Sequence, residues 1–217
     1  MTQPLLDLKD LSVKFRTARG EITAVDRLTL QLARGEVLGL IGESGSGKSV
    51  TLRALLRILP EKRTTIVGGM RVGGQDVLGM KGRALRSYRG GTVSMVFQEP
   101  ATALDPVFTI GQQISEAVRT HKGCSQADAM KRALEMLELV KIPSAASRLS
   151  NYPHEMSGGM RQRAMIALAL STSPDLLLAD EPTTALDATV QIQVILLLRD
   201  LVFLKSTIRF LRRFLIL

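Results

Sequence analysis

The amino-acid sequence predicts an α/β protein with a β-rich N-terminal edge and a helical subdomain. Three observations support this fold class. The apolar segment Val37–Ile41 leads through a glycine-rich loop into a helical pattern, and a second apolar segment, Leu176–Ala179, lies far downstream. Short continuous apolar runs are typical of parallel strands that are covered on both faces. Between these runs apolar residues recur mostly at helical spacing, so we expect strands to open the fold and helices to fill its middle.

Length and composition limit the classes of protein that fit. The chain has 217 residues, enough for one substantial domain or a core domain with a small subdomain. Its single cysteine, Cys124, excludes an internal disulfide framework and fits a reducing compartment, where we expect an ordinary thiol. The N-terminus lacks the features of a secretory signal, and no apolar run approaches the ~20 residues of a spanning helix. We therefore expect a cytosolic chain that does not cross a membrane alone.

The net charge of +9 suggests nucleic acid or an anionic lipid surface as a partner, but its distribution weakens the case for nucleic acid. Aromatic residues make up only 4% of the chain and Trp is absent, so the stacking platforms of single-strand binders are not evident. Much of the excess charge lies in the tail, residues 205–217, which has no acid and carries Lys205, Arg209, Arg212 and Arg213. We expect no nucleic-acid partner.

The first half of the chain is predicted to alternate short strands with one helix. Apolar residues alternate between positions 28 and 32 and the pattern stops at Gly35, as in a half-buried strand. The helix after the glycine-rich loop ends before Pro60, which cannot continue it. Glycine pairs between residues 67 and 79 punctuate further short strands. The other expected elements are the strands Leu11–Phe15, Ile22–Val25, Val37–Ile41 and Val93–Phe97 and the helix Ser49–Leu59.

Helices are predicted to dominate the second half. Ser125, with Asp128 three residues later, forms a capping-box start. The apolar residues that follow recur on one face, which we expect to pack inward: Ala129, Ala133, Met136, Leu137 and Val140. A second helix, about Gly159–Ser171, ends before Pro174 and precedes the buried strand Leu176–Ala179.

The glycine-rich loop, residues 42–49, fits the pattern G-x-x-x-x-G-K-S/T at every specified position, between a predicted strand and a predicted helix. Glycines let backbone N–H groups turn toward phosphates, and the helix N-terminus adds partial positive charge. Lys48 is expected to reach the β- and γ-phosphates of ATP, and the Ser49 hydroxyl to bind Mg²⁺. The alternative is a glycine turn that enters a helix by chance.

Two carboxylates directly follow the second buried strand. Asp180 is suited to orient Mg²⁺, directly or through its water, and Glu181 to polarise the attacking water as a general base. Paired acids on a loop are usually only solvated, but these come straight after a buried strand in a chain with a phosphate loop. A phosphate loop alone leaves kinases, GTPases and ATPases open, and this pair narrows the choice.

Ser157, Gly158 and Gly159 stand at the start of the second predicted helix, ahead of the two carboxylates. The physics that favours phosphate at residues 42–49 makes this turn a second anion site. Taken alone, it is as readily an N-cap followed by a flexible turn. The order and spacing of the three motifs are more specific than any one of them.

Together, the motifs resemble those of the ATP-binding subunits of ABC transporters, from the N-terminus to about residue 200. The resemblance implies an ABC-type P-loop NTPase fold, ATP and Mg²⁺ as cofactors, and two such domains paired head to tail. The Ser-Gly-Gly turn of one domain would then contact ATP held by the loop of the other. It also implies adenine stacking by Phe15, sensing of Mg²⁺ and water by Gln98, and a site acid at Asp187 in the following loop.

The residues assigned by the motifs and by the resemblance form three groups. Catalysis is assigned to Lys48, Gln98 and Glu181. Mg²⁺ binding is assigned to Ser49, Gln98 and Asp180. Nucleotide binding is assigned to Phe15, Gly42, Glu43, Ser44, Gly45, Ser46, Gly47, Lys48, Ser49, Val50, Ser157, Gly158 and Gly159.

Residues 11–15, 96–106 and 152–163 look like stretches of the oligopeptide, dipeptide and nickel importer group within that family. Met160 stands where glutamine is commoner in the wider family, yet methionine is usual in this group. His154 is expected to be a structural neighbour of the Ser-Gly-Gly turn. The resemblance implies an ATP-hydrolysing subunit that powers import of peptides or nickel at the cytoplasmic face of the cell membrane.

The partners implied are a second ATP-binding subunit, membrane permease subunits and, indirectly, an extracytoplasmic solute-binding protein. Gln98 would begin the segment that couples the site to the permease. The expected division is an ATP-binding core at residues 1–98 and 160–204, a helical subdomain at 99–159 and the atypical tail at 205–217. The permease and the binding protein choose the solute, so this chain does not name it.

The resemblance stops at about residue 200, where the family continues to a strand that ends in a histidine contacting the γ-phosphate. No histidine follows His154 here. We favour a truncated or frame-shifted end that lacks this histidine and a core strand, and therefore expect ATP binding with weak hydrolysis. One lost donor removes about 2–4 kcal/mol of transition-state stabilisation. Alternatively, the tail is a basic amphipathic helix on an anionic membrane, with an apolar face of Leu204, Ile208, Leu211 and Leu215.

Two other functions stay open. One is a non-transport ABC ATPase that acts on nucleic acid or ribosomes, although the chain has no room for the long coiled coil that such proteins often carry. The other is a non-catalytic remnant that binds nucleotide or nothing. Measuring nucleotide affinity and turnover separates the remnant from an active ATPase.

Overall fold

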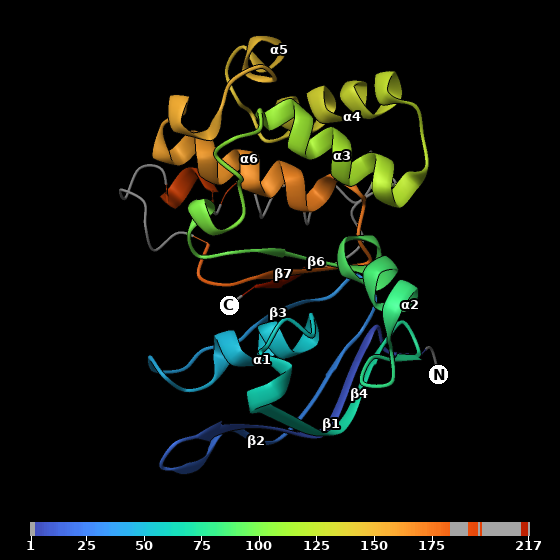
Figure 1. Ribbon diagram of the computed structural model, residues 1–217, viewed down its shortest axis with the longest axis vertical. Coiled ribbons are helices and arrows are strands. Elements are labelled where there is room, and N and C mark those ends of the chain that lie inside the picture. The colour runs from blue at the N-terminus through green and yellow to red at the C-terminus, as the bar shows by residue number, and fades with distance from the viewer. Residues whose placement is uncertain (1–2, 183–190, 195, 197–213, 217) are drawn as a thin grey trace.

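The computed structural model describes residues 3–182, 191–194, 196 and 214–216. Figure 1 shows an antiparallel sheet at the bottom, a parallel sheet in the middle and a layer of helices at the top. Helix α1 (Lys48–Leu55) packs between the two sheets, because its Leu52 and Leu55 share one apolar core with residues of both. The predicted α/β class with a β-rich N-terminal edge is confirmed.

The antiparallel sheet has the strand order β2-β1-β4-β5. Its strands are β1 (Leu6–Thr17), β2 (Gly20–Leu32), β4 (Thr64–Val72) and β5 (Gln75–Asp76). The predicted segments Ile22–Val25 and 28–32 are one strand instead of two. The polar break between them is an irregularity of the ladder, where Arg27 has a φ of 47° and its N–H donates to the Ser12 hydroxyl at 2.9 Å.

The parallel sheet has the strand order β3-β8-β7-β6. Its strands are β3 (Val37–Gly39), β6 (Val93–Val96), β7 (Leu176–Ala179) and β8 (Phe214–Ile216). Every residue of β7 is buried, as predicted. The prediction that Val37–Ile41 is covered on both faces is wrong, because β3 is an edge strand that ends at Gly39, with Val37 42% exposed.

The tail supplies a strand to this sheet. Strand β8 pairs in parallel with β3 on one side and with β7 on the other. The predicted helical face is therefore wrong at Leu215, which lies in β8, and Leu204, Ile208 and Leu211 lie outside the described residues. The expectation that a core strand is missing is also wrong. Backbone bonds to two neighbouring strands stabilise β8, and the periodicity of the tail contains no information about those neighbours.

In the described part of the chain, the upper layer is built by the long helices α3 (Ile110–Lys122), α4 (Gln126–Leu139) and α6 (Gly158–Ser171). The Ser125 side chain caps α4 as predicted, and the predicted inward face of α4 is buried in a core shared with α3 and α6. Among the described residues, no helix has the length and apolar character required to cross a membrane. The short elements are η1 (Glu61–Arg63), α2 (Gly82–Ser87), η2 (Tyr88–Thr92), η3 (Pro100–Thr102), α5 (Ala145–Arg148) and η4 (Pro153–Glu155).

Helix α1 ends at Leu55, four residues before the predicted end at Leu59. Its last carbonyl groups accept hydrogen bonds from side chains that reach it from η2. The buried Tyr88 hydroxyl donates to the Leu55 carbonyl at 2.8 Å, and Arg89 donates to the Leu56 carbonyl at 2.8 Å. Burial raises the pKa of Tyr88, so its phenol remains a neutral donor. These donors satisfy carbonyl groups that a helix end leaves without intrahelical partners.

We predict that Ile114→Ala lowers the free energy of unfolding by about 2–5 kcal/mol, because Ile114 on α3 is 0% exposed and its removal leaves a cavity. Ile22→Ala is the matched control: Ile22 is 57% exposed, so the change should stay within about 0.5 kcal/mol. Urea denaturation of both variants measures the difference. Equal losses at the two positions would contradict the core assignment.

Candidate nucleotide-binding site

The glycine-rich loop Gly42–Ser49, called the phosphate loop below, connects the region after β3 to the first turn of α1. Its residues 42–46 are exposed. Gly47 is the N-cap of α1 with a φ of 89°, a left-handed conformation that favours glycine. The first turn of α1 contains no acid. The N-terminus of α1 therefore presents backbone N–H groups and partial positive charge without a competing carboxylate on the helix itself.

Lys48 folds back over the phosphate loop. Its ammonium donates to the Gly42 carbonyl at 2.6 Å and the Glu43 carbonyl at 2.9 Å, and lies 3.4 Å from the Ser46 hydroxyl. The positive charge thus lies directly beside the loop whose N–H groups would receive a phosphate. Oxygen atoms of a phosphate are stronger partners for an ammonium than neutral carbonyl groups.

Ser49 and Asp180 meet across the site. The Ser49 hydroxyl donates to Asp180 Oδ1 at 2.7 Å, and Asp180 is only 1% exposed. Within the described residues, Asp180 Oδ2 has no hydrogen-bond partner. The guanidinium of Arg53 lies 4.0 Å from it, but the Arg53 side chain is half exposed, which weakens this ion pair.

The chemistry of this pair fits Mg²⁺. In phosphate-loop proteins this ion uses a loop hydroxyl and one carboxylate and takes its other oxygen ligands from phosphates and water. Ser49 supplies the hydroxyl, and Asp180 supplies a buried carboxylate whose Oδ2 accepts no hydrogen bond from the described residues. In the described part of the chain no group of three or more His, Cys, Asp or Glu residues is placed to hold a metal. The residues therefore suit an ion that arrives with a nucleotide.

Gln98 and Glu181 meet at the ends of two neighbouring strands. Gln98 follows β6 and Glu181 follows β7, and the side-chain amide of Gln98 donates to Glu181 Oε2 at 3.2 Å. Glu181 has a φ of 41°, which is uncommon for a residue with a Cβ atom. Parallel strands bring their carboxyl ends to one edge of a sheet, so the amide and the two acids lie at the edge where α1 begins.

Ser157, Gly158 and Gly159, called the signature turn below, lie at the start of α6. The Ser157 hydroxyl accepts a hydrogen bond from the Met160 N–H at 3.3 Å and caps the helix. Ser157 and Gly158 are exposed, and His154 nearby stacks on Tyr152 with ring centroids 5.5 Å apart. Among the described residues no hydrogen bond joins the signature turn to the phosphate loop, so the predicted nucleotide contact of this turn stays a prediction.

Two other predicted ligands occupy one small apolar cluster. Phe15 on β1 and Val50 on α1 are both half-buried and pack against Val13, Val25 and Ala54. Contact with adenine therefore stays a prediction for Phe15. Asp187 lies outside the described residues.

Sequence reasoning missed two polar residues of the site, Gln162 and Arg53. The side-chain amide of Gln162 on α6 donates to the Pro182 carbonyl at 2.6 Å, one residue after Glu181. Arg53 follows Ser49 by one helical turn, a spacing that places both on one face of α1. For Gln162 the available signal was a polar residue among inward-facing positions of an apolar helix.

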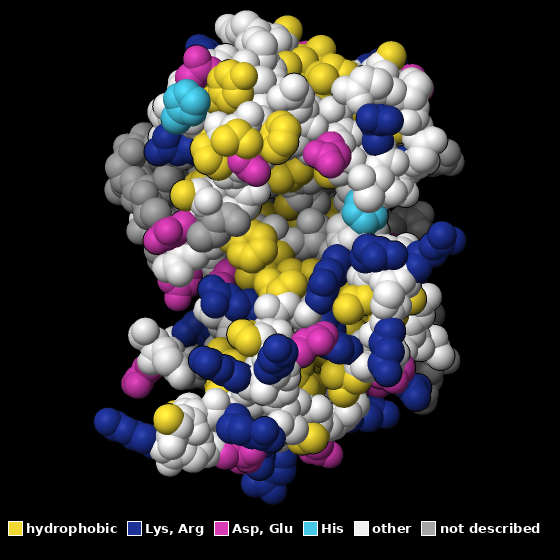
Figure 2. Space-filling model, in the orientation of Figure 1, with side chains coloured by type: hydrophobic (Ala, Val, Ile, Leu, Met, Phe, Trp, Pro, Cys, Tyr) yellow, Lys and Arg dark blue, Asp and Glu magenta, His cyan; other side chains and the backbone are white. Residues whose placement is uncertain are grey.

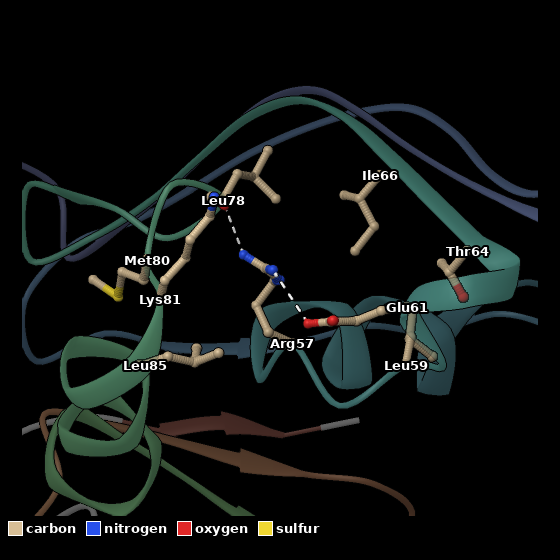
Figure 3. A pocket seen from close by; sticks show the side chains of 10 residues that line it. Arg57, Leu59, Glu61, Thr64, Ile66, Leu78, Met80, Lys81 and Leu85 are labelled. Carbon is tan, nitrogen blue, oxygen red and sulfur yellow. Dashed lines mark hydrogen bonds and ion pairs between the residues drawn. The ribbon is translucent and has the colours of Figure 1, made fainter.

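The described residues also form cavities away from this site. Figure 3 shows Arg57 in a cavity of about 520 Å³, where it donates to the Leu78 carbonyl at 2.7 Å and pairs with Glu61 at 3.7 Å. Its lining includes no residue of the phosphate loop and neither Asp180 nor Glu181. Phosphate loops hold their ligand with exposed backbone groups, so a cavity is not required at the loop.

Another cavity, of about 410 Å³ and called the central groove below, lies between the helical layer and strand β6 of the parallel sheet. Figure 2 shows apolar side chains in this hollow, with many Lys and Arg side chains below it. Burial lowers the pKa of His121 at its wall, and Lys122 lowers it further, so His121 is neutral at neutral pH. The lining includes Leu56, Ile58, Arg89, Met95, Phe97, Ala117, His121, Met165 and Leu168.

Comparisons with known proteins agree with this geometry. Residues 25–184 match the family model described as ABC transporter. A solved dimeric structure of the ATP-binding cassette MJ0796, in a post-hydrolysis state bound to ADP and Pi, superposes with a TM-score of 0.83 and 26% identity, covering 97% of this chain and 86% of that one. The predicted fold class is confirmed.

Named relatives are more similar in sequence. A peptide import ATP-binding protein of Brucella abortus (strain 2308) is 52% identical over 200 residues, which cover 92% of this chain and 60% of the relative. The D,D-dipeptide transport ATP-binding protein DdpD of Escherichia coli (strain K12) is 48% identical over 200 residues, 92% of this chain and 61% of DdpD. The chain thus spans about three fifths of the length of these relatives.

Two glycines of the phosphate loop differ in the space around them, which gives a matched prediction. A Cβ atom on Gly47 would lie 2.4 Å from the Ala24 carbonyl oxygen, whereas one on Gly45 meets nothing within 4 Å, and both glycines have positive φ. Gly45→Ala should lower the free energy of unfolding by about 1–2 kcal/mol through backbone strain alone. Gly47→Ala should cost about 2–5 kcal/mol, because strain and steric overlap add. Urea denaturation without nucleotide measures both, and similar costs would contradict the loop geometry.

Proposed function

Because this chain belongs to the ABC transporter family, we propose that it is an ATP-binding and ATP-hydrolysing subunit that powers a membrane importer for peptides. One observation carries the proposal: the Ser49–Asp180 contact and the Gln98–Glu181 contact lie at the same edge of the parallel sheet, next to the phosphate loop. This arrangement supports a site in which a phosphate cradle, a metal-binding pair and a general base would act together. The peptide as solute is inferred from the names of the relatives.

ATP binding uses the phosphate loop. The N–H groups of Gly42–Ser49 and the positive end of α1 receive the phosphates, and Lys48 exchanges its carbonyl partners for phosphate oxygens. Ser49 and Asp180 would hold Mg²⁺ beside the phosphates, where the ion neutralises charge that develops during hydrolysis. Phe15 would stack on the adenine from β1.

Hydrolysis uses the acid after Asp180. A water oxygen attacks the γ-phosphorus, the bond to the bridging oxygen breaks, and Glu181 accepts the proton of the water, leaving ADP and phosphate. Gln98 holds the Glu181 carboxylate through the 3.2 Å hydrogen bond and thereby orients the base. The family resemblance implies a histidine that follows a strand of the parallel sheet and contacts the γ-phosphate. The two histidines of this chain, His121 and His154, lie in the helical layer, and neither follows such a strand. We therefore expect slow turnover from the isolated chain.

The site is proposed to be completed by a second ATP-binding subunit. The signature turn is exposed at the N-terminus of a 14-residue helix, where an anion from another molecule can approach. The similar cassette MJ0796 forms a dimeric state bound to ADP and Pi. In the proposed dimer, the signature turn of one subunit closes on the ATP held by the phosphate loop of the other.

The central groove is proposed to receive a permease segment at the cytoplasmic face of the membrane. Phe97 lines the groove and directly precedes Gln98, so the groove and the base-orienting amide are neighbours in the chain. An amphipathic helix lying in an apolar groove is a common recognition mode. Docking there would connect permease movement to the nucleotide site.

Two substitutions test the proposed ATPase. Lys48→Ala should abolish measurable ATP binding, because it removes the cation beside the loop. Glu181→Gln should keep ATP affinity within about twofold and lower turnover by at least about 100-fold, because general-base catalysis contributes that much or more. Fluorescent-nucleotide titration and a phosphate-release assay measure the two effects.

The matched control is Glu135→Gln, an exposed partner of Arg132 on α4, which should change neither quantity. Turnover by Glu181→Gln equal to that of the unchanged chain would refute the assignment of the base. Absence of ATP binding by the unchanged chain would refute the proposed function as a whole.

A further inference from the structure

Gln162 is a buried polar side chain on the helix that begins with the signature turn. It is 1% exposed, and its side-chain amide donates to the Pro182 carbonyl at 2.6 Å. Pro182 directly follows Glu181, the proposed general base. The contact therefore joins α6 of the helical layer to the loop that carries the base of the same chain.

The surroundings of Gln162 make this contact informative. The residues that follow it on α6, Ala164, Met165 and Ile166, are buried and apolar. Burying an amide among them is costly unless its donor is used, and an apolar residue of similar size would avoid that cost. The amide is explained by what it holds, the Pro182 carbonyl, rather than by packing.

Glu181 is held from two sides. Its carboxylate accepts a hydrogen bond from Gln98, which follows strand β6, and the carbonyl of the next residue accepts one from Gln162 on α6. Between these two contacts, Glu181 adopts its uncommon positive φ of 41°. Such a conformation persists only where the surrounding structure holds it in place.

We propose that Gln162 is a positioning residue that links the signature turn to the base Glu181 of its own chain. This inference rests on the proposed function, in which the signature turn contacts ATP held by a second subunit. Gln162 follows Ser157 by five residues, about 7–8 Å along a rigid helix, so movement of the turn on nucleotide contact moves the amide. Nucleotide at one site of the dimer thereby adjusts the base at the other site.

The consequence is cooperative hydrolysis. A general base must lie within hydrogen-bond reach of the attacking water, and a displacement of about 1 Å can cost about 100-fold in rate. Removing the Gln162 amide leaves the phosphate loop, Ser49 and Asp180 unchanged. ATP binding should therefore persist while turnover and the coupling between the two sites are lost.

The experiment compares Gln162→Leu with the unchanged chain. We expect kcat to fall about 10- to 100-fold, ATP affinity to stay within about twofold, and the Hill coefficient for ATP hydrolysis to fall toward 1. A merely structural role would lower thermal stability without this separation of kcat from affinity. A folded variant with unchanged kcat and Hill coefficient would overturn the proposal.

The matched control is Gln113→Leu. Gln113 on α3 also donates its amide to backbone carbonyls, those of Asp105 at 2.8 Å and Phe108 at 2.9 Å, in the same helical layer but away from the acids. It should lose stability and keep kcat. Should Gln162→Leu fail to fold, Gln162→Met fills a similar volume with an unbranched side chain and is judged by the same criteria.

A second measurement tests the link without relying on turnover, which we expect to be slow in the unchanged chain. Hydrogen exchange of the peptide that contains Asp180 and Glu181 is followed with and without ATP in the Glu181→Gln background. Protection by ATP that disappears when Gln162→Leu is added supports the link, and protection that remains overturns it. Absence of ATP-dependent protection in the Glu181→Gln chain, with ATP binding intact, would refute the proposed dimer closure and the link that rests on it.

Discussion

The hydrogen bond from the Ser49 hydroxyl to the Asp180 carboxylate is the contact on which the rest of the site depends. It joins residues 131 positions apart at 2.7 Å and fixes the start of α1 against the end of β7. A carboxylate that is 1% exposed would be costly without donors, and this bond supplies one. Because Lys48 precedes Ser49 and Glu181 follows Asp180, one contact brings the phosphate loop and Glu181 to the same edge of the sheet.

The residues around this contact could be predicted because their chemistry is local in sequence. A lysine and a hydroxyl after glycines, and two acids after a buried strand, are recognisable without knowledge of the fold, and parallel strands bring their ends together. The strands themselves were less predictable. Val37–Ile41 and Leu176–Ala179 have similar apolar patterns, yet β3 is an edge strand and β7 is buried. The hydropathy of a segment depends only on its own residues, whereas its burial depends on which strands lie beside it in the sheet.

The structural roles of Gln162 and Leu215 could not be predicted either, because contacts distant in sequence decide them. Gln162 is a polar residue among the mostly apolar buried residues of α6, and only the position of the Pro182 carbonyl, set by the packing of α6 on the parallel sheet, explains it. Leu215 belongs to a segment with helical periodicity, but two flanking strands pair with it as β8. In both cases a contact distant in sequence decides the outcome, and tertiary context overrides local preference.

Helix α1 extends these constraints from the phosphate loop to the central groove. Its first turn is fixed by Asp180, and its last carbonyl groups are held by Tyr88 and Arg89. The residues just after the helix, Leu56 and Ile58, line the groove. A helix of 8 residues spans only about 12 Å and cannot compress, so a displacement at the loop reaches the groove wall.

Phe97 gives the groove a second connection to the site, because the next residue, Gln98, donates a hydrogen bond to Glu181. The lining of the groove is therefore adjacent to the helix that begins at the phosphate loop and to Gln98, and in the proposed function an occupant of the groove acts on both together.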